Sequence, residues 1–118
     1  MPPIATEIRV RRATRSLDVS FDDGHSANLP AEYLRVESPS AEVQGHAPDQ
    51  KVLVSGKQEV NIASVDPIGN YAVRIRFSDG HDTGIFTWPY LYELSVEHPV
   101  RWAAYLQALA VKGLRRSA

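Results

Sequence analysis

The residues of this chain best suited to chemistry are two histidines in matching Asp-Gly-His triplets. His25 closes the triplet in "FDDGH" and His81 closes the one in "FSDGH". A histidine beside a carboxylate can bind a metal ion or act as a general base, because imidazole titrates near neutral pH. It can also simply bond the backbone of a turn. From sequence alone the structural role is favoured for both histidines.

Other catalytic signatures are missing from the sequence. His46 and His98 add no spacing typical of metal ligands, and the aspartates around the triplets are explained by turn chemistry as well as by acid–base catalysis. There is no glycine-rich phosphate loop and no nucleophile elbow. The chain contains no cysteine, which excludes disulfides, thiol catalysis and cysteine-ligated metals. The residues give no positive support to an enzyme.

Composition limits the remaining classes of function. The sequence has 118 residues, 43% of them hydrophobic and 23% charged, which is typical of a globular chain. We expect residues 1–118 to form a single domain. A formal net charge of −1 gives no electrostatic reason to expect a nucleic-acid or membrane partner. No apolar run reaches the length of a signal peptide or a membrane span, so a cytoplasmic location is expected.

Alternating apolar and polar residues predict the strands that hold the two triplets. Residues 17–21 and 71–77 alternate regularly, and each run ends at Asp-Gly, a strong hairpin signal because both residues tolerate positive φ. Weaker alternation predicts strands at 8–10, 27–29 and 60–65. One common offset relates the two triplets and the phenylalanines before them. The chain is therefore predicted to consist of two related units, each too small to bury its own apolar face.

Helical signals follow each hairpin. Pro30 can start a short helical corner, and the segment "TWPYLYEL" has the same place in the second unit. Trp102, Tyr105, Leu106 and Leu109 have the spacing of an amphipathic helix, which we expect to pack on the sheet. The predicted fold class is α+β: two antiparallel β-hairpin units with short helical corners and a C-terminal helix packed on the sheet.

The middle of the chain, "SPSAEVQGHAPDQKVLVSGKQ", is the least regular part. Ser38 and Pro39 are predicted to cap and begin one helical turn, and glycines and prolines prevent a longer helix. Connections of this length are more often functional than structural. We therefore expect the loop to contribute to any working surface.

Two segments, "GNYAVRIRFSDGHDTGIFTWPYLYEL" and "LPAEYLRVESPSAEVQGH", resemble a small bacterial family of unknown function. That family is grouped with the N-terminal domain of gamma-butyrobetaine dioxygenase. The resemblance extends from about Ile8 to Leu109 and implies a small α+β domain rich in hairpins. In the dioxygenase this domain precedes the catalytic jelly roll and lacks the Fe(II)/2-oxoglutarate site. A similar domain is attached to P-loop ATPases of iron–sulfur assembly.

The resemblance also implies where a metal would be held in other members. There, Leu-Arg is followed by Cys-x-Cys-x-x-Cys, and a later histidine completes a zinc site. Here Ser38, Ser40 and Val43 occupy the cysteine positions, while His81 matches the family histidine. Serine is a poor zinc ligand and valine is none. We expect His81 still to face the loop, with hydrogen bonds in place of coordination.

These observations favour a small non-catalytic accessory or protein-interaction module that binds an unknown protein partner and needs no cofactor. Two alternatives remain open. One is weak binding of zinc or iron, or a role linked to iron–sulfur proteins, by His81 with oxygens such as that of Glu42. The other is an enzyme or small-molecule binder linked to carnitine-like metabolism. The residues predicted to form the partner surface or vestigial metal site are Ser38, Ser40, Val43, His46, Asp79, His81 and Asp82.

Overall fold

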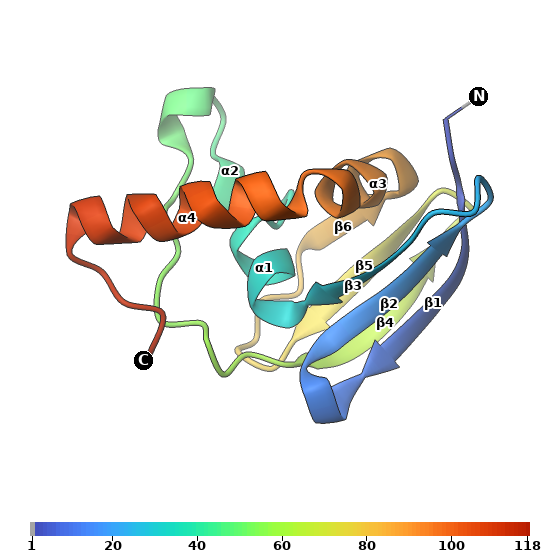
Figure 1. The fold of residues 1–118 in the computed structure, drawn as a ribbon, viewed down its shortest axis with the longest axis horizontal. Coiled ribbons are helices and arrows are strands. Elements are labelled where there is room, and N and C mark those ends of the chain that lie inside the picture. The colour runs from blue at the N-terminus through green and yellow to red at the C-terminus, as the bar shows by residue number, and fades with distance from the viewer. Residues whose placement is uncertain (1) are drawn as a thin grey trace.

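A computed structural model describes residues 2–118 of the chain and contains six strands, four α-helices and two 3₁₀ turns in that range (Figure 1). The strands are β1 (Ala5–Arg11), β2 (Ser16–Phe21), β3 (Ser26–Pro30), β4 (Ile62–Ile68), β5 (Ala72–Phe77) and β6 (Gly84–Thr87). The α-helices are α1 (Ala31–Val36), α2 (Ala41–Gln44), α3 (Trp88–Val96) and α4 (His98–Lys112), and the 3₁₀ turns are Arg12–Thr14 and Pro48–Gln50.

The strands form two separate antiparallel sheets with the same topology. Their orders are β1-β2-β3 and β4-β5-β6, each a meander whose central strand has both neighbours. A register irregularity falls in the first strand pair of each sheet, between Ala5 and Glu7 in one and between Ile62 and Ser64 in the other. The α+β class and the two hairpin units predicted from the sequence are confirmed.

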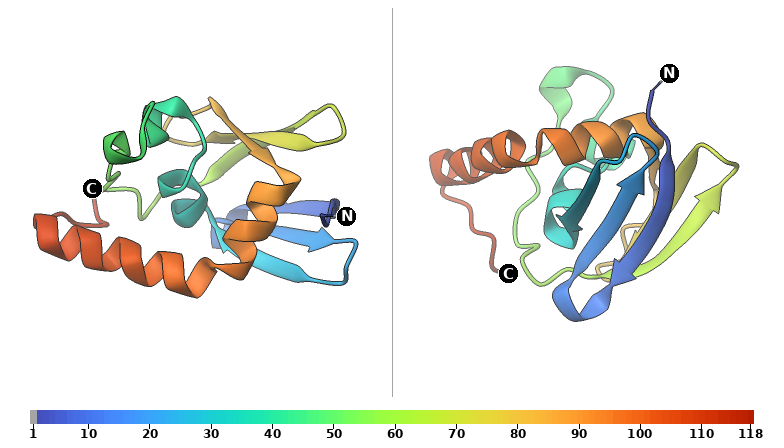
Figure 2. Two further views of the ribbon diagram at one scale, coloured as in Figure 1. Left: turned by 90° about the horizontal axis from the view of Figure 1, so that it is seen from above. Right: turned by 45° about the vertical axis from the view of Figure 1, so that its right-hand side comes forward.

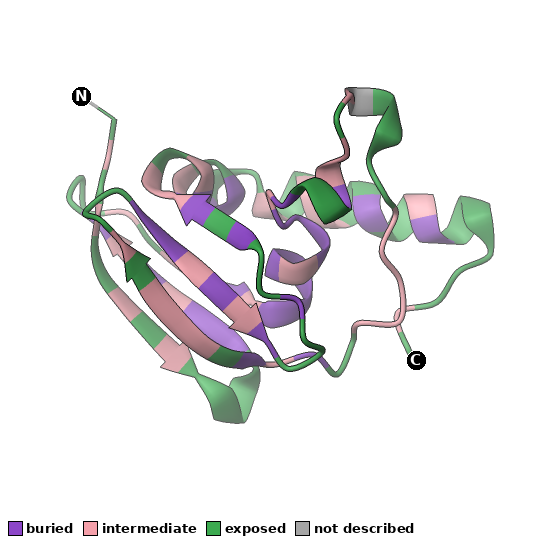
Figure 3. Ribbon diagram, turned by 180° about the vertical axis from the view of Figure 1, so that it is seen from behind, coloured by how far each residue is buried: buried purple, intermediate pink, exposed green. Residues whose placement is uncertain are grey.

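The core lies where the two sheets and the short helices meet (Figures 2 and 3). The central strands β2 and β5 have the same alternation of buried and partly buried residues, which explains why the period-2 pattern was strongest there. Leu17, Val19 and Ile75 are fully buried. Each three-stranded sheet has one apolar face, and the two faces bury one another through a shared core.

Helices α1 and α3 occupy equivalent places after β3 and β6, and two tyrosines join them reciprocally. The Tyr33 hydroxyl of α1 donates to the Leu94 carbonyl of α3 at 2.8 Å. The Tyr90 hydroxyl of α3 donates to the Glu37 carbonyl at the end of α1 at 2.5 Å. Because each unit gives the other the same type of bond, the contact resembles the interface of a two-fold symmetric dimer.

Helix α4 begins beside Pro99 and ends at Gly113, whose φ of 67° is in the left-handed region that favours glycine. Tyr105 and Leu109 form a second small cluster with Val36 of α1, while Trp102 packs against the main core. Leu106, at the margin of this face, is 40% exposed. No helix among residues 2–118 is both long enough and apolar enough to cross a membrane.

Candidate functional site

The Asp79-Gly80-His81 turn holds its histidine by backbone geometry. The Phe77 N–H donates to the His81 carbonyl at 2.9 Å, and the His81 N–H donates to Asp79 Oδ1 at 3.0 Å. Gly80 has a φ of 93°, a conformation that side-chain-bearing residues rarely adopt. The turn therefore requires Asp and Gly in this order, and it directs the imidazole of His81 inward.

His81 lies between the turn and the α2 loop, with only 6% of its surface exposed. Its Nε2 is 2.8 Å from Ser38 Oγ and its Nδ1 is 3.0 Å from Glu42 Oε2. Burial, followed by the nearby positive charge of Arg35, lowers the pKa of His81 and favours the neutral ring. A carboxylate can only accept, so we assign the proton to Nδ1 and the acceptor role to Nε2, which then receives the Ser38 hydroxyl proton.

The serine loop is held to the same turn region by further hydrogen bonds. Ser40 Oγ is 2.6 Å from Thr83 Oγ1, and it accepts the backbone N–H of Glu42 at 3.2 Å. Ser40 is thus the N-cap of α2. The sequence-based prediction that Ser38 caps this helical turn is wrong: Ser38 points to His81 instead, and the helix begins at Ala41.

Asp79 joins the turn to two cations from other parts of the chain. Its Oδ2 accepts from Arg35 Nε and Lys57 Nζ, both at 2.8 Å. Burial of the carboxyl acts to raise its pKa, but the hydrogen bonds from Lys57, the His81 N–H and Arg35 outweigh burial and hold the pKa at about 2. Asp79 is therefore ionised at neutral pH and forms ion pairs with both cations.

The chain of contacts from Ser38 through His81 to Glu42 has the polarity of a serine hydrolase triad. Ser38, however, has no exposed surface. Gly84 packs directly over it, so closely that a Cβ at position 84 would lie 2.4 Å from Ser38 Oγ. A nucleophile must reach a substrate carbonyl, and this hydroxyl is covered. The arrangement therefore stabilises the loop and does not support acyl transfer.

The same residues do not fit the zinc ion that the family pattern implies. Both ring nitrogens of His81 already have hydrogen-bond partners, Ser38 Oγ and Glu42 Oε2, and Arg35 adds positive charge nearby. Among residues 2–118, no group of three or more His, Cys, Asp or Glu side chains could hold a metal ion. A zinc site needs several nitrogen, sulfur or carboxylate ligands around one point.

The structure brings together only some of the residues predicted from the sequence. Ser38, Ser40, His81 and Asp79 meet in one cluster, which we call the serine–histidine cluster and which also includes Glu42 and Arg35. Val43 is buried at 1% exposure, whereas His46 and Asp82 are exposed and make no side-chain contact with the cluster among the described residues. Ser38, Ser40 and His81 are thus interior, whereas Glu42 is exposed.

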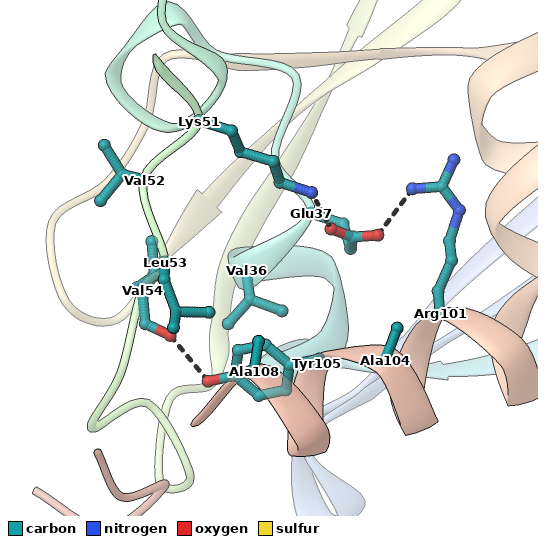
Figure 4. A pocket seen from close by; sticks show the side chains of 10 residues that line it. All are labelled: Val36, Glu37, Lys51, Val52, Leu53, Val54, Arg101, Ala104, Tyr105 and Ala108. Carbon is teal, nitrogen blue, oxygen red and sulfur yellow. Dashed lines mark hydrogen bonds and ion pairs between the residues drawn. The ribbon is translucent and has the colours of Figure 1, made fainter. Parts of the chain in front are cut away.

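A groove of about 360 Å³ adjoins the cluster, between α4 and the irregular segment 51–54 (Figure 4). The Tyr105 hydroxyl donates to the Val54 carbonyl at 2.7 Å, which fixes the segment to α4. The Val52 N–H donates to the Val43 carbonyl of α2 at 2.7 Å, which fixes it to the loop. The apolar lining consists of Val36, Val52, Leu53, Val54, Ala104, Tyr105 and Ala108.

One end of the groove is charged. The buried carboxylate of Glu37 accepts from Lys51 Nζ at 2.7 Å and from Arg101 Nη1 at 2.6 Å (Figure 4). Sequence reasoning missed this groove because its lining comes from three distant segments. It also missed the roles of Arg35 and Lys57, which no local pattern marks.

Several known proteins are similar to this chain. The model of the family described as gamma-butyrobetaine hydroxylase-like, N-terminal, matches residues 8–92. A solution NMR structure is 46% identical over 99% of this chain and 92% of its own, with a TM-score of 0.85. A crystal structure of a protein of unknown function from Acidithiobacillus ferrooxidans, of the DUF971 family, is 44% identical over 77% of this chain and 91% of its own, with a TM-score of 0.64. No curated protein matches the chain significantly.

Proposed function

The chain belongs to the gamma-butyrobetaine hydroxylase-like N-terminal family, and from that premise we propose that it is a non-catalytic protein-interaction module. We propose further that the module binds an extended segment of a partner protein in the groove between α4 and residues 51–54. The observation that carries the proposal is the groove itself, which is open and apolar, whereas Ser38, Ser40 and His81 of the serine–histidine cluster are buried.

The groove has the chemistry of a site for an apolar side chain flanked by peptide groups. Leu53, Val54 and Ala104 supply apolar walls, and Val52 at its rim is 48% exposed. Burying an apolar side chain there gains roughly 25 cal/mol for each Å² removed from water. The ion pairs of Glu37 at one end leave its charge compensated, so no strongly charged ligand is required.

The backbone of the groove wall favours a peptide over a small molecule. Within the part of the chain that the structure describes, the N–H groups of Leu53, Val54 and Ser55 donate no hydrogen bond. An extended peptide can accept from such groups and place alternate side chains in a groove, as in strand-addition complexes. The partner segment is therefore expected to be extended, with at least one aliphatic or aromatic residue.

The serine–histidine cluster supports this function by positioning the wall of the groove. His81 and Ser38 hold the α2 loop, and α2 in turn holds segment 51–54 through the bond between Val43 and Val52. The buried residues of the cluster thus contribute indirectly. Their loss is expected to change the groove without removing any group that touches the partner.

The proposal is tested by selecting binders from a library of random peptides displayed on phage, with the purified chain as the target. Selected peptides are then titrated into ¹⁵N-labelled protein. We expect enrichment of short peptides with a spaced apolar residue, and chemical-shift changes concentrated at Leu53, Val54 and Ala104. Leu53→Glu, which places a charge in the apolar groove, is expected to weaken binding at least tenfold.

Val96→Glu is the matched control, because it changes an exposed apolar residue to the same acid outside the groove lining. It should leave peptide affinity unchanged. The proposal is overturned if no peptide is enriched over an unrelated target. It is equally overturned if the shift changes fall outside the groove, or if both variants bind as the wild type does.

A further inference from the structure

Helix α4 has a second apolar face that is mostly exposed in the described chain, and only Ala104 and Ala108 at one edge of it also line the groove. Its inner face packs through Trp102, Tyr105 and Leu109. On the outer face, Val100 is 75% exposed and Val111 is 72% exposed. Between them on the same side lie exposed Ala103, Ala104 and Gln107, together with partly buried Ala108.

Surface helices normally carry charged residues on the side that faces water. In α4 the only charged side chains after His98 are Arg101 and Lys112, one near each end of the helix. The outer side of the helix between them is uncharged over three helical turns. Figure 1 shows α4 running across the front of the molecule with no other element over it. A helix that is apolar on nearly all sides is typical of one that is covered on both sides.

We propose that this outer face of α4 binds the same face of a second copy of the chain, with the two helices antiparallel. The order of residues along the face reads nearly the same in both directions. Antiparallel pairing centred between Tyr105 and Leu106 places Val100 opposite Val111 of the second copy. It likewise places Ala103 opposite Ala108 and Ala104 opposite Gln107. Such self-complementarity is what a two-fold interface requires.

The small central residues suit a close approach of two helices, while the valines fill the wider ends. Glutamine at position 107 is the one polar residue of the centre, and its amide would lie next to a backbone exposed by alanine. Because the pairing is isologous, every contact occurs twice. A second copy therefore pairs with every residue of the face, which an unrelated helix would not do.

The distribution of charge favours the antiparallel orientation. Glu93 of α3 and Glu97, the N-cap of α4, share Arg101, which leaves a net negative charge beside the start of α4. Lys112 and Arg115 lie at the other end and make no ion pair among residues 2–118. In the antiparallel arrangement each basic end meets an acidic end, and the helix dipoles also oppose. A parallel arrangement would bring like charges together.

The absence of native cysteine makes a direct test possible. Gln107→Cys puts a single thiol near the two-fold axis, whereas Val100→Cys puts one at the far end of the face. Under mild oxidation at equal protein concentration, we expect Gln107→Cys to form a disulfide dimer at least ten times faster than Val100→Cys. The double variant Val100→Cys with Val111→Cys should form dimers rapidly, because each thiol would then face its intended partner.

Analytical ultracentrifugation over a series of protein concentrations tests the unmodified chain. We expect reversible dimerisation, with Ala103→Glu raising the dissociation constant at least tenfold. Ile85→Glu is the control, since it makes the same kind of change at an exposed apolar residue of β6 and should have no effect. Circular dichroism establishes that both variants remain folded.

A single monomeric species up to millimolar concentration would overturn the proposal, as would dimerisation that Ala103→Glu does not weaken. Equal oxidation rates for Gln107→Cys and Val100→Cys would overturn the antiparallel pairing. Ala104 and Ala108 belong both to this face and to the groove lining, whereas Val100, Ala103 and Gln107 belong to the face alone. The substitutions at Ala103 and Gln107 therefore test dimerisation, and Leu53→Glu tests the groove. If the chain does not dimerise, the peptide groove is still tested by Leu53→Glu. If no peptide binds, dimerisation is still tested by Ala103→Glu.

Discussion

The two Asp-Gly-His turns have almost the same backbone and different surroundings. In the first turn, the Phe21 N–H donates a hydrogen bond to the His25 carbonyl at 2.8 Å. In the second, the Phe77 N–H donates to the His81 carbonyl at 2.9 Å. Gly24 and Gly80 have φ values of 87° and 93°. The rings of the paired phenylalanine and histidine are 6.0 Å apart in one turn and 5.9 Å apart in the other.

The difference lies in what covers each histidine. His25 packs beside Tyr92, and its Nε2 is buried without a hydrogen-bond partner in the described chain. His81 instead has Ser38 and Glu42 on its two ring nitrogens. The second turn is thus covered by the α2 loop, whereas the first packs against Tyr92 of α3. The repeated Asp-Gly-His triplet therefore determines the same turn backbone twice, while the role of each histidine side chain depends on which segment packs over it.

The largest difference in stability between the two turns is expected when their aspartates, Asp79 and Asp23, are replaced. Asp79→Ala would leave Arg35, whose side chain is only 12% exposed, without its carboxylate partner, and would also remove the acceptor of the His81 N–H. Breaking such a pair typically costs about 3 kcal/mol. Asp23→Ala removes only the bonds from Tyr92 and from the His25 backbone at an exposed turn, and a clearly smaller loss is expected.

Urea denaturation followed by circular dichroism gives both free energies of unfolding. Equal losses for Asp79→Ala and Asp23→Ala would show that the aspartates serve only their turns. The ion pairs of Asp79 with Arg35 and Lys57 would then contribute nothing that the first turn lacks.

The histidines are the next largest expected difference. His81→Ala removes a buried ring and leaves the Ser38 hydroxyl without its acceptor, which together should cost about 2 kcal/mol. His25→Ala removes a ring with no hydrogen bond from its buried nitrogen, so a smaller loss is expected. Hydrogen exchange of the α2 amides separates the two further: it should accelerate in His81→Ala and stay unchanged in His25→Ala.

The sequence predicted the repeated part of the fold well because strands and Asp-Gly turns are local properties. The offset between the triplets identified two units, and the helices after Pro30 and before Gly113 followed from their end signals. The cluster around His81 was predicted in part, since its contact with Ser38 was expected from the family pattern. Arg35 and Lys57 could not be predicted, because their meeting with Asp79 depends on tertiary packing.

The groove was likewise invisible in the sequence. Its lining joins residues 36–37, segment 51–54 and one side of α4, and no periodicity connects these three. The outer apolar face of α4 was visible in principle, because the spacing of Val100, Ala104 and Val111 is as helical as that of the inner face. With two apolar faces on one helix, the residues alone do not tell which face the core uses.

Substitution of Gly24 and of Gly80 should change the stability equally, and this prediction tests whether the two turns have the same backbone conformation. A Cβ at Gly24 or at Gly80 would meet no atom within 4 Å, so only the backbone conformation is affected. An L-residue in this left-handed region costs roughly 1 kcal/mol or somewhat more. Gly24→Ala and Gly80→Ala are expected to lower the free energy of unfolding equally. A difference larger than the experimental error would mean that the α2 loop strains the second turn.

The smallest expected effect is a pH dependence of stability that arises from His81 in the second turn. Burial, and then the positive charge of Arg35, lower the pKa of His81 below its ordinary value of 6.5, although Glu42 and Asp79 partly oppose this shift. The unfolded chain therefore binds a proton at His81 more readily than the folded chain does. As pH falls below about 6.5, proton uptake favours unfolding, and stability is lost until the folded pKa is reached.

His81→Gln should consequently lose less stability than the wild type between pH 7.5 and pH 5.5. Burial also lowers the pKa of His98, but that contribution is common to both proteins and cancels in the comparison. Asp79, with a pKa of about 2, stays ionised throughout this range. Urea midpoints at several pH values provide the measurement. If His81→Gln and the wild type lose stability in parallel, the protonation of His81 does not oppose folding, and the hydrogen-bond polarity assigned to Ser38 and Glu42 is wrong.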